Sequence, residues 1–361
     1  MALRRVPQPE IESLADFDAR VTQSPSLVGW TVQSVDLSQR GSVLAHLTVT
    51  GTLFLGCQFG AGVEESLTRR GAFVFPTLPG PPFNPYRAGL YTAGELYDAQ
   101  TYAETTDARV YAWYTAQPTP VPVAAGLAMS LHDNSIVEAL ADRLADVSHV
   151  VGLMGGHALC RGDRDYRLAA ALGAGLAGAG LIVASGGGPG AMEAANLGAR
   201  SAPADLPGLL DQLAQVPDYA PDVMAWAQAG LAIVPALRPT FTLGIPTWYY
   251  GHEPPNVFAS DIAKLFSNAI REDLLLATCR AGLIYLPGAA GTVQEVFQAA
   301  TRNYYAADPT LVTPLVFYGR HYWTETVPVW RLIRSLARGR AMANRLYLVD
   351  DIDQALAALG G

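Results

Sequence analysis

The chain has 361 residues, half of them apolar, which is enough to bury a large core in about two domains and excludes a disordered protein. Its 24 basic and 32 acidic residues give a net charge of -8, which argues against a nucleic-acid partner because such proteins normally present a basic face. The three cysteines form no CxxC pair and no even set, as is typical of a reducing compartment.

The segment Met1 to Glu10 contains no apolar stretch, so we expect no signal peptide and a cytoplasmic protein. The longest uncharged stretch, from Leu168 to Met192, is interrupted by several glycines. It therefore predicts helix, strand and loop instead of a membrane span. The six histidines have no zinc-type spacing, and we expect no metal site.

Residues 1–115 are predicted to form a smaller β-rich N-terminal domain. Apolar residues recur at every fifth position in two blocks: Leu27, Val32 and Leu37, then Leu44, Val49, Phe54 and Phe59. This spacing suits the short coils of a pentapeptide-like β-helix, although ordinary alternating strands would also produce it. Residues 75–114 are rich in Pro, Gly and Tyr and predict irregular structure.

Residues 116–127 form a Pro-rich linker, which marks the expected domain boundary. A capping box, Ser135 with Glu138, predicts that a helix begins there. Farther along the chain, helices alternate with short apolar strands, which indicates a parallel sheet with helices on both faces. The expected strands are residues 150–154, 181–184, 231–234, 282–286, 314–317 and 346–349, and the expected helices include residues 165–179 and 258–278. Residues 201–250 interrupt this alternation and are interpreted as an insertion.

Two glycine-rich loops each lie between a predicted strand and a predicted helix. The first is Ser185-Gly186-Gly187-Gly188-Pro189-Gly190, and the second is Pro287-Gly288-Ala289-Ala290-Gly291-Thr292. Glycine lets the backbone approach a ligand closely, and the unpaired amides and the dipole at a helix start attract anions. Two such loops in one sheet indicate binding of a phosphate ester. The alternative is that each loop is only a tight turn. Neither loop continues into Lys-Ser/Thr, so neither is an ATP-hydrolysing P-loop.

The stretch from Ser185 to Ala199, together with residues 287–295, resembles the paired signatures of the Lonely Guy (LOG) family, GGGPGxMEAANxGA and PGGxGTxxE. The resemblance extends from about residue 128 to the C-terminus. It implies that residues 128–361 form a Rossmann-like nucleotide-binding domain of the LOG type. Ala289 stands where the family has glycine, a difference that is expected to tighten the second loop.

The resemblance implies hydrolysis of the N-glycosidic bond of a nucleoside 5'-monophosphate such as AMP, which releases the free base and ribose 5-phosphate. It also implies that Glu295, at the end of the second signature, is catalytic and that Arg271 helps to hold the substrate. Close to a positive helix end Glu295 is expected to be ionised, able to activate water and stabilise a cationic sugar. The alternatives are a glutamate that serves only the helix dipole and a surface arginine paired with Glu or Asp.

Further residues are expected to contact the phosphate or the nucleotide. In the loops these are Gly186, Gly187, Gly188, Gly190, Gly288, Ala289, Ala290, Gly291 and Thr292. Glu193 and Asn196 are expected to orient the first loop and the nucleotide, or else to support the helix from the core. His157 follows the first strand of the domain, where a nucleotide site is expected. The aromatic stretch at residues 244–256 either stacks on a base or is a packed loop.

Lysine decarboxylase, a label often given to this family, is excluded because it requires pyridoxal phosphate bound to a lysine. The only lysine, Lys264, lies in a predicted helix with no loop that suggests a cofactor pocket. We expect no cofactor and no membrane partner, and the resemblance implies a homodimer. A second hypothesis is a non-catalytic nucleotide-binding sensor module of the same fold.

Overall fold

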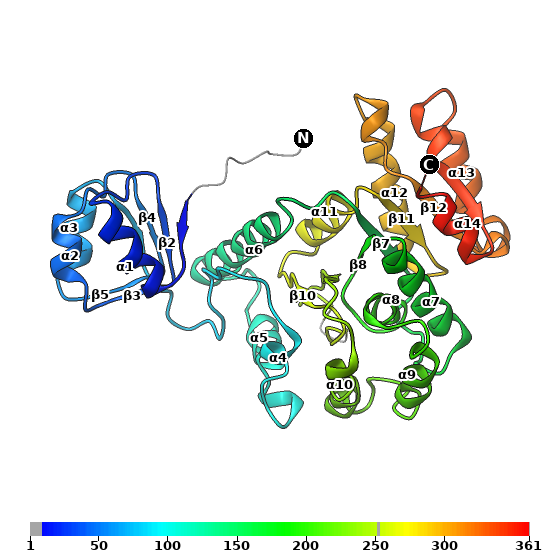
Figure 1. The fold of residues 1–361 in the computed structure, drawn as a ribbon, viewed down its shortest axis with the longest axis horizontal. Coiled ribbons are helices and arrows are strands. Elements are labelled where there is room, and N and C mark those ends of the chain that lie inside the picture. Colours follow the sequence, from blue (N-terminus) through cyan, green and yellow to red (C-terminus); the bar gives the residue numbers. More distant parts are fainter. Residues whose placement is uncertain (1–8, 251–252, 361) are drawn as a thin grey trace. The chain divides into compact units, whose positions relative to one another are not determined.

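The structure is a computed structural model that describes residues 9–250 and 253–360 (Figure 1). These residues form two compact units. Unit 1 consists of the described residues up to Leu90 together with Trp113–Ala145, and unit 2 consists of Tyr91–Ala112 together with the described residues from Asp146 onward. We call Tyr91–Ala112 the arm. This division differs from the single boundary expected at residues 116–127, because Tyr91 of the arm pairs with an edge strand of the unit 2 sheet at Ile262.

Unit 1 is built from short parallel strands that alternate with helices. Its main sheet has the order β1-β2-β4-β6, and β3 pairs with β5. The strands are β1 (Glu10–Ile11), β2 (Thr31–Gln33), β3 (Asp36–Leu37), β4 (Leu53–Leu55), β5 (Gln58–Phe59) and β6 (Phe73–Phe75). The helices among them are α1 (Leu14–Gln23), α2 (Gly41–His46) and α3 (Val63–Arg69). The register aligns Val32, Phe54 and Val74, so successive repeats of strand and helix stack on one another.

The five-residue pattern marks the core of unit 1. Six of its seven positions are buried and Phe59 is partly buried. The pentapeptide-like β-helix is nevertheless wrong, because helices α2 and α3 separate the strands. Gly29, Gly51 and Gly71 each lie two residues before a strand with φ of +75°, +72° and +86°. Only glycine adopts this backbone conformation readily, so these three positions fix the turn of each repeat.

Helix α6 (Val123–Arg143) begins well before the residue predicted from the capping box. Pro122 precedes its first turn, so the Pro-rich segment is shorter than the expected linker. Ser135 lies inside the helix and donates its hydroxyl to the carbonyl of Pro85 at 3.0 Å. The residues between Pro122 and Ser135 include several Ala and Leu, which favour a helix even without a side-chain cap. The stretch expected to be irregular contains α4 (Ala93–Leu96), a 3₁₀ turn (Tyr102–Glu104) and α5 (Thr106–Thr115).

Unit 2 is a Rossmann-like α/β layer structure with a seven-stranded parallel sheet and helices on both faces (Figure 1). The sheet order is β10-β9-β8-β7-β11-β12-β13. Its strands are β7 (Val150–Met154), β8 (Ile182–Ser185), β9 (Leu243–Gly244), β10 (Asp261–Ile262), β11 (Gly282–Tyr285), β12 (Leu315–Tyr318) and β13 (Leu346–Val349). Its helices include α7 (Arg164–Gly178), α8 (Ala191–Arg200), α9 (Leu206–Leu213), α10 (Val223–Leu231), α11 (Asn268–Thr278), α12 (Ala290–Tyr304), α13 (Val329–Leu336) and α14 (Ile352–Ala357).

Three predictions for unit 2 are wrong. Residues 231–234, expected as a strand, form the end of α10 and a 3₁₀ turn. The expected helix at residues 258–278 begins only at Asn268, because β10 occupies Asp261–Ile262 and Lys264 follows that strand. The interval at residues 201–250 is not only an insertion, since β9 within it is a strand of the sheet.

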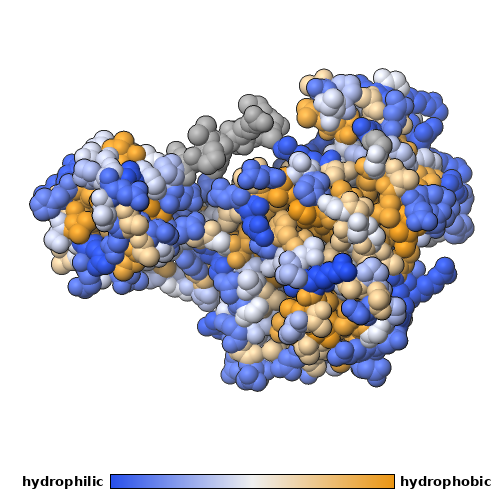
Figure 2. Space-filling view, viewed as in Figure 1, coloured by the Kyte–Doolittle hydropathy of each residue, from blue (hydrophilic) through white to orange (hydrophobic). Residues whose placement is uncertain are grey.

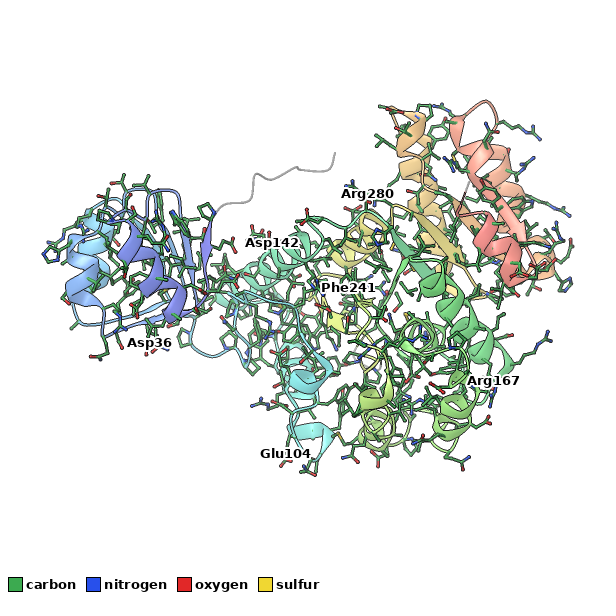
Figure 3. The ribbon with its side chains drawn as sticks, viewed as in Figure 1. Asp36, Glu104, Asp142, Arg167, Phe241 and Arg280 are labelled. Atoms are coloured by element: carbon green, nitrogen blue, oxygen red, sulfur yellow. The ribbon has the colours of Figure 1, made fainter. Side chains whose placement is uncertain are left out.

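The surface of unit 2 is mixed in character. Apolar residues gather in patches on the face shown in Figure 2, and the exposed apolar side chains include Tyr305, Leu311 and Leu332. Arg167 of α7 is labelled in Figure 3. Its side chain donates to Asp211 at 2.6 Å. Within the described residues, no helix combines the length and apolarity needed to cross a bilayer. The expected homodimer stays a prediction.

At β7 the chain changes the side of the sheet to which it adds strands, as the order β8-β7-β11 shows. The chain passes from β7 to β8 on one side and later adds β11 on the other side of β7. Ligands of open parallel sheets bind at such a switch point, beyond the carboxyl ends of the strands. Both glycine loops and His157 follow these three strands, so the topology brings them to one edge of the sheet.

Candidate functional site

The two glycine loops meet at the turn that follows β7. The amide of Gly156 donates to the carbonyl of Pro287, which begins the second loop, at 3.3 Å. The carbonyl of Gly156 accepts from the amide of Ala191, directly after the first loop, at 3.1 Å. A Cβ atom at Gly190 would lie 2.6 Å from that same carbonyl. The glycines therefore allow three backbone segments to approach one another at the carboxyl end of the sheet.

The first loop, Gly186–Gly190, is buried along its whole length. The amide of Gly187 donates to the hydroxyl of Ser185 at 3.1 Å. The carbonyls of Gly187 and Gly188 accept from the backbone amide and the side chain of Asn256, at 2.8 and 3.2 Å. Ser185 and Asn256 thus hydrogen-bond both the amide and the carbonyl groups of this loop. The close packing of the loop explains why several of its residues are glycines.

Glu193 and Asn196 lie beneath the first loop and are both buried. Asn196 accepts from the hydroxyl of Ser185 at 2.7 Å and donates to the hydroxyl of Thr242 at 2.6 Å. Glu193 forms a buried ion pair with Arg161, whose Nε lies 3.1 Å from Oε1 of Glu193. These contacts agree with support of the loop from the core. Arg161 carried no signal in the sequence, because its partner lies 32 positions away.

The second loop is more accessible than the first. Ala289, Ala290 and Gly291 are exposed, and Ala290 begins helix α12. The amides in the first turn of a helix have no partner within the helix, so they point toward an external acceptor. Ala289 has φ of -82° and ψ of -152°, which an L-residue adopts without strain. The backbone at Ala289 therefore does not require glycine, and the expectation that alanine tightens this loop stays a prediction.

Arg271 and Glu295 form the centre of the candidate site. Nη1 of Arg271 lies 3.3 Å from Oε1 of Glu295. Its Nη2 lies 3.3 Å from the carbonyl of Gly186, and its Nε donates to the carbonyl of Ile245 at 2.8 Å. Arg271 is 9% exposed and Glu295 is 7% exposed, so a surface arginine is the wrong interpretation. One arginine thus connects the first glycine loop with the helix that the second loop begins.

The ionisation of Glu295 differs from the expectation. Burial raises the pKa of its carboxyl from 4.5 to about 7, and Arg271 opposes this shift while Glu272 and Glu253 add to it. Because α12 begins at Ala290, Glu295 lies in the second turn of the helix, beyond the reach of the helix-end dipole. The carboxyl therefore exchanges its proton near neutral pH, as a general acid or base does.

The two further carboxylates that raise the pKa of Glu295 were not singled out from the sequence. Glu272 is buried; its Oε1 accepts from Asn268 at 2.8 Å, and its Oε2 accepts from the side chain of Gln294. Glu253 lies 3.2 Å from Nδ1 of His157. His157 is 40% exposed at its side chain, follows β7 at the switch point and contacts Glu253.

The aromatic stretch at residues 244–256 is only partly available to a ligand. Trp248 is buried and stacks on Phe266 with ring centroids 4.7 Å apart, whereas Tyr249 is 57% exposed. Gly251 and His252 lie outside the described residues. In residues 9–250 and 253–360, no group of three or more His, Cys, Asp or Glu side chains is placed to hold a metal ion.

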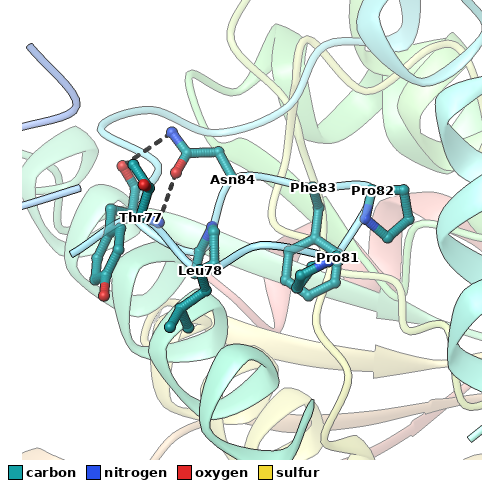
Figure 4. A pocket seen from close by; sticks show the side chains of 8 residues that line it. Thr77, Leu78, Pro81, Pro82, Phe83 and Asn84 are labelled. Carbon is teal, nitrogen blue, oxygen red and sulfur yellow. Dashed lines mark hydrogen bonds between the residues drawn. The ribbon is translucent and has the colours of Figure 1, made fainter. Parts of the chain in front are cut away.

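A surface pocket of about 400 Å³ lies elsewhere, in unit 1 (Figure 4). Its lining comes from a Pro-rich loop that includes Thr77, Phe83 and Asn84. None of the residues predicted for the site lines it. We therefore assign the candidate site by the chemistry and topology of unit 2 and not by the shape of this pocket.

Comparison with known proteins identifies the segment that carries the first glycine loop. Residues 148–233 match the model of the SLOG cluster4 family. This family belongs to the LOG/SLOG superfamily of Rossmann-like folds, which confirms the resemblance over this segment. The SLOG match includes β7, β8 and the first glycine loop, but ends before Arg271 and the second loop. It indicates a nucleotide-related Rossmann-like module.

Solved structures also resemble the chain, at low identity. The molybdenum cofactor binding protein from the phototrophic bacterium Rippkaea orientalis is 16% identical with a TM-score of 0.38, over 58% of this chain and 94% of that one. The molybdenum cofactor carrier protein from Chlamydomonas reinhardtii is 18% identical with a TM-score of 0.37, over 58% of this chain and 95% of that one. The protein TM1055 is 15% identical with a TM-score of 0.35, over 59% of this chain and 99% of that one. No curated protein matches the chain. Likeness at this level carries no information about function.

Proposed function

We propose that unit 2 hydrolyses the N-glycosidic bond of nucleoside 5'-monophosphates, releasing a free base and ribose 5-phosphate. The observation that carries this proposal is the buried pair of Arg271 and Glu295 at the junction of the two glycine loops. The SLOG match supports a nucleotide as the ligand. The switch point between β7 and β11 is the edge of the sheet where such a ligand is expected.

The phosphate is proposed to bind at the start of α12. Ala290 and Gly291 are exposed there, and the first-turn amides and the helix dipole favour an anion. The hydroxyl of Thr292 faces Gly288, where a Cβ atom would lie only 2.3 Å from Oγ1. A phosphate at this helix start would leave the ribose to extend toward Arg271 and Glu295.

The chemistry follows from the ionisation of Glu295. With a pKa of about 7, a large fraction of its carboxyl is deprotonated at neutral pH and able to take a proton from water. The bond from C1' of the ribose to the base nitrogen breaks with its electron pair going to the base, the oxygen of that water bonds to C1', and the proton that Glu295 takes from the water is passed on to the departing base. The sugar becomes cationic as the base departs, and the carboxylate stabilises this charge in a site with little water.

The alternative is a module that binds a nucleotide without cleaving it. One observation favours it: the first loop is buried, and the amide of Gly187 is already satisfied by Ser185. In that case Arg271 and Glu295 serve to hold the two loops together. Binding would then occur without release of base.

A hydrolysis assay separates these functions. The purified protein is incubated with AMP, GMP, IMP, CMP and UMP, and free base and ribose 5-phosphate are quantified. We expect release from at least one nucleotide and a loss of about 10²- to 10⁴-fold in kcat for Glu295→Gln. Glu325→Gln, at an exposed glutamate, is the matched control and should keep full activity. Nucleotide binding without release would favour the sensor, and absence of both would contradict the proposed function and the alternative.

A further inference from the structure

Hydrogen bonds connect the arm of unit 2 to the first glycine loop through the peptide group between Pro255 and Asn256. The hydroxyl of Tyr97, just after α4, donates to the carbonyl of Pro255 at 2.6 Å. The amide of Asn256 belongs to the same peptide group and donates to the carbonyl of Gly187 at 2.8 Å. Tyr97 is 5% exposed and Asn256 is fully buried. The phenol, the peptide and the loop thus form an unbroken chain of hydrogen bonds.

Burial makes each member of this chain depend on the others. Hydrogen bonds in series polarise one another, and in a buried region water cannot replace a lost partner. The side chain of Asn256 extends the same contact, because it donates to Gly188 at 3.2 Å and to Asn196 at 3.1 Å. The peptide between Pro255 and Asn256 is therefore the point at which the arm can influence the loop.

The arm itself is firmly anchored in unit 2. Tyr91 exchanges two backbone hydrogen bonds with Ile262, at 2.8 and 2.9 Å. Asp107 of the arm is buried, forms an ion pair with Lys264 and accepts from Nε1 of Trp248 at 2.9 Å. Tyr97 consequently presents its hydroxyl from a fixed backbone and not from a mobile segment.

We propose that Tyr97 is a positioning residue for the first glycine loop, acting through the peptide group between Pro255 and Asn256. The hydroxyl holds this peptide in the orientation that fixes Gly187 and Gly188. The consequence for binding rests on the proposed nucleotide site, whereas the consequence for the loop does not.

The test compares Tyr97→Phe with Tyr86→Phe. Tyr86 is a matched control in unit 1, because it is 2% exposed and also donates its hydroxyl to a proline carbonyl, that of Pro76 at 3.1 Å. Amide hydrogen exchange of the full chain is followed by mass spectrometry for peptides that cover residues 185–192 and 255–259. We expect about five- to tenfold faster exchange of both peptides in Tyr97→Phe only, the size of effect that one lost buried hydrogen bond produces.

A binding measurement tells the two proposals apart. Isothermal titration with ribose 5-phosphate should show about fivefold weaker binding for Tyr97→Phe and unchanged binding for Tyr86→Phe. Faster exchange without detectable binding in any form of the protein would support the positioning role and contradict the proposed function. Unchanged exchange at residues 255–259, or loss of cooperative unfolding in Tyr97→Phe, would overturn the positioning role.

Discussion

Arg271 stands between Glu295, 3.3 Å from its Nη1, and the carbonyl of Ile245, 2.8 Å from its Nε. It therefore joins α11, α12 and the end of β9 in one polar contact. Inside a buried site such a contact is strong when complete and costly when one member is removed. The state of the Glu295 carboxyl consequently affects both the chemistry and the stability of unit 2.

Stability should fall as the Glu295 carboxyl ionises. Its pKa is raised from 4.5 to about 7 in the folded protein, so the folded state binds this proton more tightly than the unfolded state. The resulting stabilisation is full below about pH 4.5, declines as the pH rises and is lost above about pH 7. From the pKa difference it amounts to about 3 kcal/mol. Urea unfolding from about pH 5 to pH 8 should show this decline in the wild type but not in Glu295→Gln.

The control for this measurement is the exposed Glu325. Glu325→Gln should reproduce the pH dependence of the wild type, because Glu325 is exposed and lies outside the candidate site. A wild-type profile that runs parallel to that of Glu295→Gln would contradict the raised pKa.

Gly186→Ala should disrupt the contact between Arg271 and the first loop. A Cβ atom at this position would lie 2.3 Å from Nη2 of Arg271 and 2.6 Å from Sδ of Met192. We expect destabilisation of about 1–3 kcal/mol and loss of any hydrolytic activity. Gly208→Ala is the control: Gly208 lies in α9, a Cβ atom added there would meet no side chain or other segment within 4 Å, and alanine should stabilise by about 0.5–1 kcal/mol. Equal unfolding midpoints for the two variants would contradict this prediction.

Lys264→Met should be strongly destabilising. The lysine and Asp107 are both about 2% exposed at their side chains, so the substitution leaves a buried carboxylate without its cation. Such a loss costs about 3–5 kcal/mol. The double variant with Asp107→Asn should recover part of the loss, because the buried charge is then gone. The comparison is Arg320→Met, which breaks the ion pair with Asp350. The two side chains are 58% and 57% exposed, so the substitution should lower the free energy of unfolding by about 1 kcal/mol or less. Chemical unfolding curves measure all three.

Ala289→Gly should leave ligand binding nearly unchanged. Ala289 has an ordinary backbone conformation and an exposed side chain, so glycine gains no access for the phosphate. We expect the affinity for ribose 5-phosphate to stay within about twofold of the wild type, a difference of less than 0.5 kcal/mol. Binding that is tenfold tighter would show that the alanine obstructs the loop after all.

The central sheet of unit 2 was predictable because its strands are continuous apolar runs that are buried on both faces. The bounds predicted for β7 and β13 agree with the structure, and β8, β11 and β12 differ only at their ends. The strands β9 and β10 were missed, since two residues each give no periodicity to detect. Because strand β10 was missed, the helix at residues 258–278 was predicted to include Lys264.

The sequence indicated residues of the candidate site but not their arrangement in space. Glu295 and Arg271 were expected from motif resemblance, whereas their direct contact depends on how α11 and α12 pack. The raised pKa of Glu295 was not predictable either, because burial is a property of the folded chain. The contact of Arg161 with Glu193 and that of Glu272 with Gln294 join residues 32 and 22 positions apart, so no local pattern reveals these contacts.

The arm also decides where the chain can be divided. A fragment that begins at residue 128 would lack Asp107 and would leave the lone lysine uncompensated in an apolar interior. It would also open the outer edge of the sheet at Ile262, where free backbone groups recruit strands from other molecules. A fragment that keeps unit 2 intact therefore has to retain residues 91–112, even though they precede the Pro-rich segment.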